Sequence, residues 1–194
     1  VHIDAHIDIA WFNPASPLDL LAARSGAELD AMLRSVPAWN PSPDPKSHKP
    51  NIGNYICSAI RDGIVDTVYW VVPDSFFDTP RHIRFWKKAV ADVVRDAPGR
   101  REDVFVDGRK IRTRLAGCTL TVCRLGDLPE LSSRVLLDID TDFLVTDHDA
   151  ARHKELLYVK RLLPWMWPDE LAAAISNKGI DPSAVSFAYS VEGF

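Results

Sequence analysis

Two short stretches of the chain combine apolar strand residues with side chains that could bind a metal ion. In VHIDAHIDI, residues 1–9, the side chains of Asp4, His6 and Asp8 alternate with apolar residues and would share one face of an extended strand. The stretch LLDIDTDFL repeats the pattern much later, with the alternating aspartates Asp138, Asp140 and Asp142. Because each group closes an apolar run, we expect both groups to lie where a strand leaves the core.

Carboxylates that converge at two strand ends need a counter-charge. Burial and mutual repulsion would raise several of their pKa values if they stood alone. A divalent cation removes this cost, because hard metals bind carboxylate oxygen and imidazole suits Mn, Fe or Zn. A fully extended strand would place Asp4 and Asp8 about 13 Å apart, at about 3.3 Å per residue. One ion with bonds of about 2.1 Å cannot span that distance. Either the chain curls there, or the residues serve two ions roughly 3.5–4 Å apart.

The alternative for each single residue is structural. A lone aspartate at the end of a strand is usually a cap or a turn residue. His2 lies earlier in the first strand and is most simply a core or surface histidine. Asp-x-His-x-Asp followed by Asp-x-Asp, each closing an apolar strand, is difficult to explain by caps alone. The ligand types and their spacing therefore favour a metal site.

Short β-branched runs that alternate with helical patterns must position these groups. Strands are predicted at 1–7, 66–72, 119–125, 134–140 and 184–190, with a hairpin over 104–115. Helices are predicted at 16–36, 51–63, 79–99, 147–165 and 168–179. This order predicts an α/β fold with a mainly parallel sheet covered on both faces. In such a sheet the ligand site lies beyond the carboxyl ends of the strands.

The composition is that of an ordinary globular domain. The chain has 194 residues, and its net charge of -4 gives no reason to expect a nucleic-acid partner. No run is long and apolar enough to span a membrane. The three cysteines, an odd number among apolar residues, indicate reduced thiols in a cytoplasmic protein. We expect a single domain over 1–194 that lacks residues at both ends, since the chain starts inside a strand pattern and stops abruptly at Phe194.

The motifs DAHID and DIDTD together resemble the paired metal motifs of the arginase–deacetylase superfamily, in which Asp-Ala-His-x-Asp and Asp-x-Asp hold two manganese ions. The segments HKPNIGNYICSAI and PWMWPDE are similar to an arginase-related family that includes peptide arginases. The likeness runs through most of the chain. It implies a three-layer α/β/α fold with a mainly parallel sheet and two Mn²⁺ as cofactors. It also implies hydrolysis of peptidyl arginine to ornithine and urea.

The resemblance assigns a role to each ligand of the two ions. Asp4 and Asp138 would bridge the ions. Asp8 would bind one ion, while His6 and Asp140 would bind the other.

Two positions depart from the superfamily pattern. The superfamily also uses a histidine before the first motif, which we expect upstream of Val1, and His2 is a poor substitute for it. The ureohydrolase pattern has its next aspartate one residue later than Asp142, so we expect Asp142 at most to orient other groups.

Two comparisons within the superfamily favour hydrolysis of a guanidinium group in a peptide. Single-zinc deacetylases use paired histidines beside the metal, whereas this chain has no His-His pair and has the additional Asp8 and Asp140. Arginases that act on free arginine carry an Asn two residues after the first motif, where it holds the amino-acid end of the substrate. Here that place is Ala10, followed by Trp11. We therefore expect an arginine-containing peptide as substrate, with Trp11 among the residues that bind it.

The expected reaction is attack of a metal-bridging hydroxide on the guanidinium carbon. A carboxylate must hold the guanidinium, and Glu192 is the candidate, with an exposed turn residue as the alternative. His48, in the proline-rich segment 36–50, is the candidate for moving protons, and the alternative is a solvated loop histidine. Asn51 and Asn54 are candidates for substrate binding, although Asn51 could simply cap the following helix.

Other functions stay open at this point. Another ureohydrolase or a deacetylase-type amidohydrolase would use a related ligand set, and a non-catalytic binding module could retain the site as a relic. Metallophosphoesterases use Asp-x-His, Gly-Asp and Gly-Asn-His in that order, but here the order differs and no His follows Asn54. The sequence indicates no particular oligomeric state.

Overall fold

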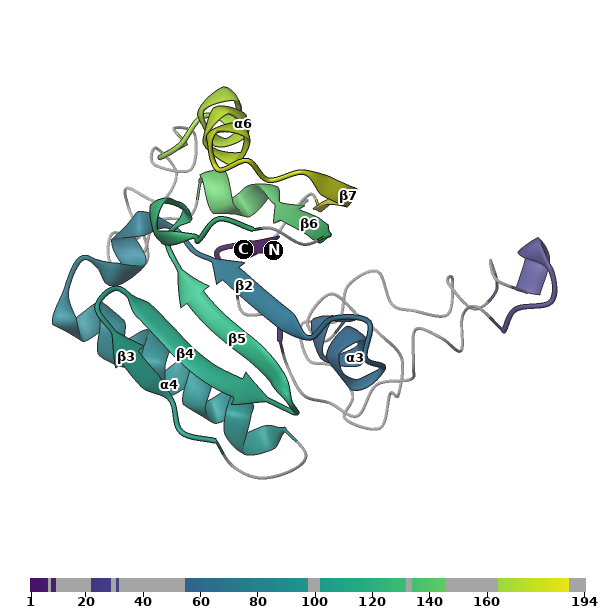
Figure 1. Cartoon of the computed structure of the whole chain (residues 1–194), viewed down its shortest axis with the longest axis horizontal. Helices are drawn as coiled ribbons and strands as arrows, with labels where there is room; N and C mark the ends of the chain where they lie inside the picture. The colour runs from purple at the N-terminus through teal and green to yellow at the C-terminus, as the bar shows by residue number, and fades with distance from the viewer. Residues whose placement is uncertain are drawn as a thin grey trace, which may run out of the picture.

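The computed structural model describes residues 1–6, 8–9, 22–28, 31, 55–97, 102–131, 134–145 and 164–188. Within these residues the chain forms a seven-stranded sheet in the order β3-β4-β5-β2-β1-β6-β7 (Figure 1). The strands are β1 (His2–Ile3), β2 (Thr67–Val71), β3 (Phe105–Asp107), β4 (Lys110–Leu115), β5 (Cys118–Cys123), β6 (Val135–Asp140) and β7 (Pro182–Ala188). The predicted α/β fold with a mostly parallel sheet is confirmed.

The sheet has a parallel part and an antiparallel edge. Strands β5, β2, β1, β6 and β7 are parallel, and β1 lies between β2 and β6. The predicted hairpin is formed by β3 and β4, which pair antiparallel to each other and to β5. Its turn places Gly108 at a φ of 59°, a left-handed conformation that glycine adopts without steric cost. The site depends on β1 and β6, which lie near the other end of the sheet.

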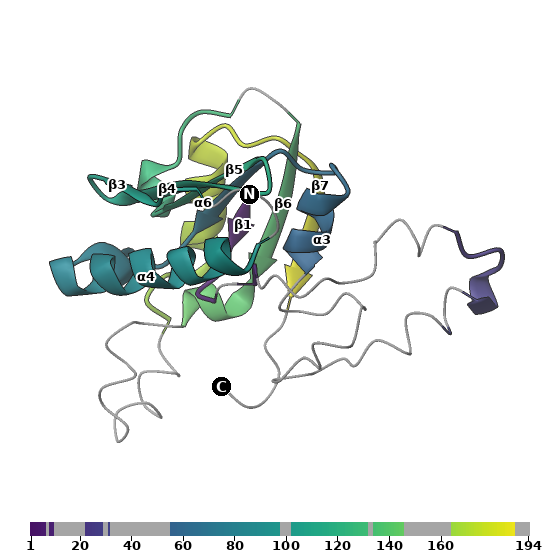
Figure 2. The ribbon, with the colours of Figure 1, turned by 90° about the horizontal axis from the view of Figure 1, so that it is seen from below.

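Helices pack on both faces of the sheet. On one face, α3 (Tyr55–Arg61), η1 (Asp74–Phe77) and α4 (Pro80–Asp96) cover a core that includes Trp70 and Leu120. On the other face, η2 (Leu125–Asp127), η3 (Thr141–Leu144) and α6 (Pro168–Asn177) cover Ile3 and Leu137. Figure 2 shows α4 along one side of the sheet. Strands β2 and β5 are largely buried on both faces because both faces are covered there.

Local signals in the sequence explain where α4 and α6 begin. The side chain of Thr79 accepts a hydrogen bond from the amide of His82 at 3.2 Å, and Pro80 occupies the first turn of α4. The side chain of Glu170 accepts a bond from the Trp167 amide at 2.8 Å at the start of α6. Both helices lie within their predicted ranges. Among the described residues, none of the helices has the length and apolar composition that a membrane span requires.

The first strand is much shorter than predicted. The alternation in the sequence suggested a strand over 1–7, but β1 contains only His2 and Ile3. The chain bends directly afterwards, at residues 5 and 6. Most of the helix predicted over 16–36 and nearly all of the helix predicted over 147–165 lie outside the described residues.

Candidate metal centre

The two aspartate-rich motifs lie side by side at the carboxyl ends of β1 and β6. These strands are parallel neighbours, with His2 opposite Asp138 and Ile3 opposite Ile139. One step further along the strands come Asp4 and Asp140. Since Ile3 and Ile139 point into the core beneath α6, the alternating residues face the side on which α3 lies.

Asp4 is held in place from both of its main-chain groups. Its amide donates to the carbonyl of Val71 at 3.0 Å, and its own carbonyl accepts from the indole Nε1 of Trp70 at 3.0 Å. Its carboxylate is fully buried, and Oδ1 accepts a hydrogen bond from the amide of His6 at 2.7 Å. That bond makes the chain curl after β1. In an extended strand Asp4 and Asp8 would lie too far apart to share one ion. The curl brings residues 6 and 8 back towards Asp4.

A first group of potential ligands consists of Asp4, His6 and Asp142. Their nearest ligand atoms all lie within 4.8 Å of one another. Nδ1 of His6 lies 2.5 Å from Oδ2 of Asp142 and 3.8 Å from Oδ1 of Asp4. Asp142 reaches this position because η3 begins after Asp140, whose Oδ1 accepts from the Asp142 amide at 3.1 Å.

A second group consists of His2, Asp4 and Asp8, whose ligand atoms also lie within 4.8 Å of one another. Oδ2 of Asp4 lies 3.1 Å from Nε2 of His2. The two oxygens of Asp4 therefore face two different histidines, His6 at Oδ1 and His2 at Oδ2. Asp4 belongs to both groups and is the residue that joins them.

Asp138 has a different environment from the one that the motif suggested. Its Oδ2 accepts hydrogen bonds from Nδ1 of His2 at 2.8 Å and from the hydroxyl of Tyr55 at 2.6 Å. Its Oδ1 accepts from the hydroxyl of Ser186 at 2.5 Å. Although burial opposes ionisation, these three donors hold the pKa of Asp138 at about 2. The carboxylate is ionised and accepts hydrogen bonds at both oxygens, and its expected role as a ligand that bridges two ions stays a prediction.

Asp142, and not Asp140, is grouped with Asp4 and His6. Asp142 is buried, whereas Asp140 is partly exposed and supports the start of η3. Its position makes Asp142 a further potential ligand, and the expectation that it only orients other groups stays a prediction. The physical reason for its position is that β6 ends at Asp140, and the following turn directs the next acidic side chain towards His6.

The protonation of the cluster reflects its excess of carboxylates. Burial lowers the pKa of His2, but the two carboxylates beside it outweigh this effect and raise the pKa to about 9. The hydrogen bond to Asp142 raises the pKa of His6 to about 9 as well. Burial and the repulsion from neighbouring carboxylates raise the pKa of Asp8 to about 7. The site thus attracts positive charge, and protons on two imidazoles supply it in the absence of a metal.

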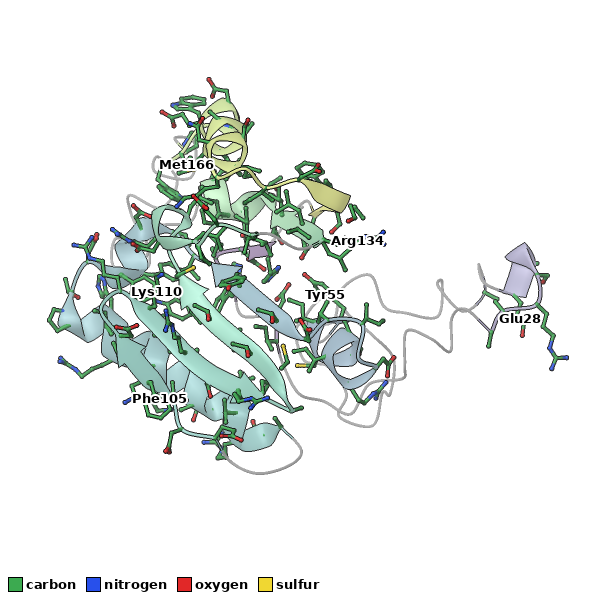
Figure 3. The ribbon with its side chains drawn as sticks, in the orientation of Figure 1. Glu28, Tyr55, Phe105, Lys110, Arg134 and Met166 are labelled. Carbon is green, nitrogen blue, oxygen red and sulfur yellow. The ribbon has the colours of Figure 1, made fainter. Side chains whose placement is uncertain are left out.

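A cleft of about 600 Å³ approaches the cluster from the side of α3. Tyr55 at the start of α3 and Arg134 before β6 both border it (Figure 3). His2, Asp138 and Ser186 are among the residues that line it, whereas Asp4 and Asp142 are not. Solvent therefore reaches the Asp138 side of the cluster through this cleft.

The remaining predicted site residues cannot be placed beside this cluster. Trp11, His48, Asn51, Asn54 and Glu192 all lie outside the described residues, as does Ala10. Sequence reasoning missed three groups that the structure brings together, namely His2, Tyr55 and Ser186. Ser186 stands opposite Asp138 in the pairing of β6 with β7, so the alternation in β7 would have indicated it once the strand order was known. No sequence signal links Tyr55 to Asp138.

The site consists of ligand types that commonly bind divalent metals. Imidazole nitrogens and carboxylate oxygens from two neighbouring strands converge on one edge of a mostly parallel sheet, and the shared Asp4 divides them into two overlapping groups. This arrangement can bind divalent cations. Comparisons of the chain with protein-family models, with curated proteins and with solved structures found no match.

Proposed function

We propose that this protein is a hydrolase of the arginase type, with a three-layer α/β/α fold and two divalent cations at the carboxyl ends of β1 and β6. The observation that carries the proposal is that one carboxylate, Asp4, belongs to two groups of potential ligands. Carboxylates that bridge two ions roughly 3.5–4 Å apart are typical of hydrolytic two-metal sites. The three cysteines, all among the described residues, are buried and form no disulfide, which supports the proposed cytoplasmic location.

The residues fit a pair of Mn²⁺ ions. Carboxylate oxygens together with imidazole nitrogens suit Mn, Fe or Zn, and the resemblance of the motifs favours Mn. Oδ2 of Asp4 is buried and faces Nε2 of His2 at 3.1 Å, and a cation would take the place of the proton between these two atoms. In the proposed site, Asp142 takes the place beside His6 that the motif assigned to Asp140. Asp8 serves the second ion.

The chemistry follows from the charge of the cluster. When bound, the ions would activate a water molecule for attack on the guanidinium carbon and withdraw charge from the group attacked. Asp4, held by Trp70 and by the main chain of Val71, would hold both ions from one fixed position. The side chain of His6 is 44% exposed, so solvent reaches this part of the cluster.

We further propose that the substrate is arginine within a peptide and that the products are ornithine and urea. The α-carboxylate and the α-ammonium of free arginine would each need a hydrogen-bonding partner, and their burial without one costs free energy. An interior arginine has neutral peptide groups in that place. The resemblance to peptide arginases and the presence of Ala10 support the same choice.

The test compares urea release from an arginine-containing peptide and from free arginine, at matched concentrations and with Mn²⁺ loaded. The peptide should give the larger kcat/KM. Asp4→Asn should abolish urea release, whereas Asp66→Asn, at an exposed position before β2, should retain it. Equal turnover of free arginine would favour an amino-acid ureohydrolase. Hydrolysis of an acetylated amine without urea release would favour the deacetylase branch, and bound metal without any turnover would favour a binding module.

A further inference from the structure

The charges of this chain are unevenly distributed along the sequence. Residues 80–115, which contain α4 and the β3–β4 hairpin, hold 11 of the 23 lysines and arginines but only five of the 27 aspartates and glutamates. This segment therefore carries a net charge of +6, although the whole chain carries -4. A positive region in an otherwise acidic protein attracts anionic partners.

The outer face of α4 carries a stripe of cations. Figure 2 shows α4 along one face of the sheet, and its apolar side is anchored there by Trp86, whose ring stacks on Phe76 at a centroid distance of 4.2 Å. Phe85, which is 54% exposed, lies one helical turn after the first cation. The stripe is about 21 Å long at about 1.5 Å per residue. This basic stripe consists of the exposed side chains of Arg81, Arg84, Lys88 and Arg95.

Helix stability does not account for the cations at the start of the basic stripe. Arg81 and Arg84 lie near the N-terminus of α4, and the first turn of this helix has no acidic residue. The helix macrodipole is positive at this end, so cations here destabilise the helix. Lys88 and Arg95, by contrast, both pair with Asp92, at 2.6 and 2.7 Å. The unfavourable placement of Arg81 and Arg84 indicates a role outside the fold.

A short acidic segment of another protein fits the basic stripe in charge and length. About seven residues of an extended peptide, at about 3.3 Å per residue, match its length. Phe85 offers an apolar contact beside the cations for an aliphatic side chain of the same segment. A nucleic acid or an anionic membrane would extend beyond the stripe towards the rest of the molecule, which carries a net charge of -10. Repulsion there would oppose binding of these larger polyanions.

We propose that the basic stripe of α4, together with Phe85, is a docking surface for an acidic, extended segment of a partner protein. Arginine binds carboxylates through two parallel hydrogen bonds, so Arg81 and Arg84 are the main contacts. The positive end of the helix dipole adds to their attraction for an anion. The ion pairs with Asp92 hold Lys88 and Arg95 in place at the other end of the stripe.

The experiment measures fluorescence anisotropy of a labelled peptide of about seven residues, rich in glutamate and with one leucine, at about 0.1 M salt. In the full chain, Arg81→Gln with Arg84→Gln should weaken peptide binding roughly two- to tenfold. Arg112→Gln with Arg114→Gln is the matched control, because it removes the same charge from the opposite face of the sheet. Their neighbour Ile111 points into the core beneath α4, so the two arginines point away from that helix. The control should bind the peptide with parental affinity.

Urea denaturation separates the loss of docking from a loss of the fold. Because Arg81 and Arg84 oppose the helix dipole, their replacement should raise the urea midpoint while it weakens peptide binding. A lower midpoint would assign these cations to the fold and would overturn the proposal. Equal loss of affinity in both double variants would also overturn it, as would a parent protein that does not bind the acidic peptide. Tighter binding of a single-stranded oligonucleotide, or of vesicles that contain anionic lipid, would replace the partner protein by a nucleic acid or a membrane.

Discussion

Replacement of Tyr55 by phenylalanine tests whether the hydrogen bond from Tyr55 holds Asp138 in position beside His2. Tyr55 lies at the start of α3, and its hydroxyl donates to Oδ2 of Asp138 at 2.6 Å. Phenylalanine keeps the ring, which packs against the core cluster beneath α3, and removes only the oxygen. The substitution therefore isolates one hydrogen bond to an ionised carboxylate.

The size of the effect follows from the surroundings of that carboxylate. A hydrogen bond to a charged group contributes roughly 1.5–3 kcal/mol when it is buried. The side chain of Asp138 is 23% exposed and keeps its bonds from His2 and Ser186, so the loss should lie near the lower end. We expect the free energy of unfolding to fall by about 1–2 kcal/mol, at about 2–4 °C in Tm per kcal/mol for a chain of this size. Asp138 should also hold His2 less firmly, and Mn²⁺ affinity should fall by up to roughly tenfold.

Urea denaturation and Mn²⁺ titration of the same preparation would measure both effects. Tyr69→Phe is the matched control, since Tyr69 also lines the cleft and its hydroxyl has no hydrogen bond to a described residue. Equal losses in the two variants would show that the effect comes from the ring environment. Unchanged stability and affinity in Tyr55→Phe would refute the idea that Asp138 depends on its donors.

Three further predictions concern the ligands, the fold and the effect of pH. Asp142→Asn should weaken Mn²⁺ binding by at least about 100-fold and Asp140→Asn by about tenfold, as measured by titration; the opposite order would restore the assignment based on the motif. Thr79→Ala should lower the free energy of unfolding by about 1 kcal/mol, because α4 loses its cap; denaturation curves that superimpose would contradict this. The raised pKa values of His2 and His6, both about 9, mean that their protons stabilise the metal-free fold fully below about pH 6.5 and that this contribution is lost as the pH rises through 9. Metal-free protein should therefore unfold at a lower urea concentration at pH 9.5 than at pH 6.5. A higher urea midpoint at pH 9.5 would contradict the claim that these protons stabilise the metal-free protein.

The sequence predicted the elements of the sheet well because their signals are local. The β-branched runs and the turn at Gly108 define strands regardless of what surrounds them, and Thr79 with Pro80 marks the start of α4. Apolar residues on both faces of the strands also predicted that helices cover both sides. These properties depend on short segments and on burial, which leave a pattern in the chain itself.

The candidate site was harder to predict because its geometry depends on how strands end. Alternation placed Asp4 and Asp8 on one face only as long as the strand continued, and β1 ends at Ile3. The curl at His6 and the turn after Asp140 involve single hydrogen bonds to side chains, which no periodicity reveals. The motif therefore identified the acidic positions but did not predict the place of Asp142 beside His6.

The network around Asp138 explains how one edge of a sheet can hold so many carboxylates. Asp138 is compensated permanently by Tyr55, Ser186 and His2, so it adds little unbalanced charge to its neighbours. Asp4 accepts a hydrogen bond from the amide of His6 and Asp142 one from the amide of Ala5, and protons on the imidazoles add to this compensation. Metal binding must displace those protons, so the affinity for the metal should increase with pH. Over the same pH range, the free energy of unfolding of the metal-free protein should decrease. Metal binding and folding are thus linked at this edge of the sheet. Bound metal should stabilise the fold most at high pH, where the metal-free protein is least stable.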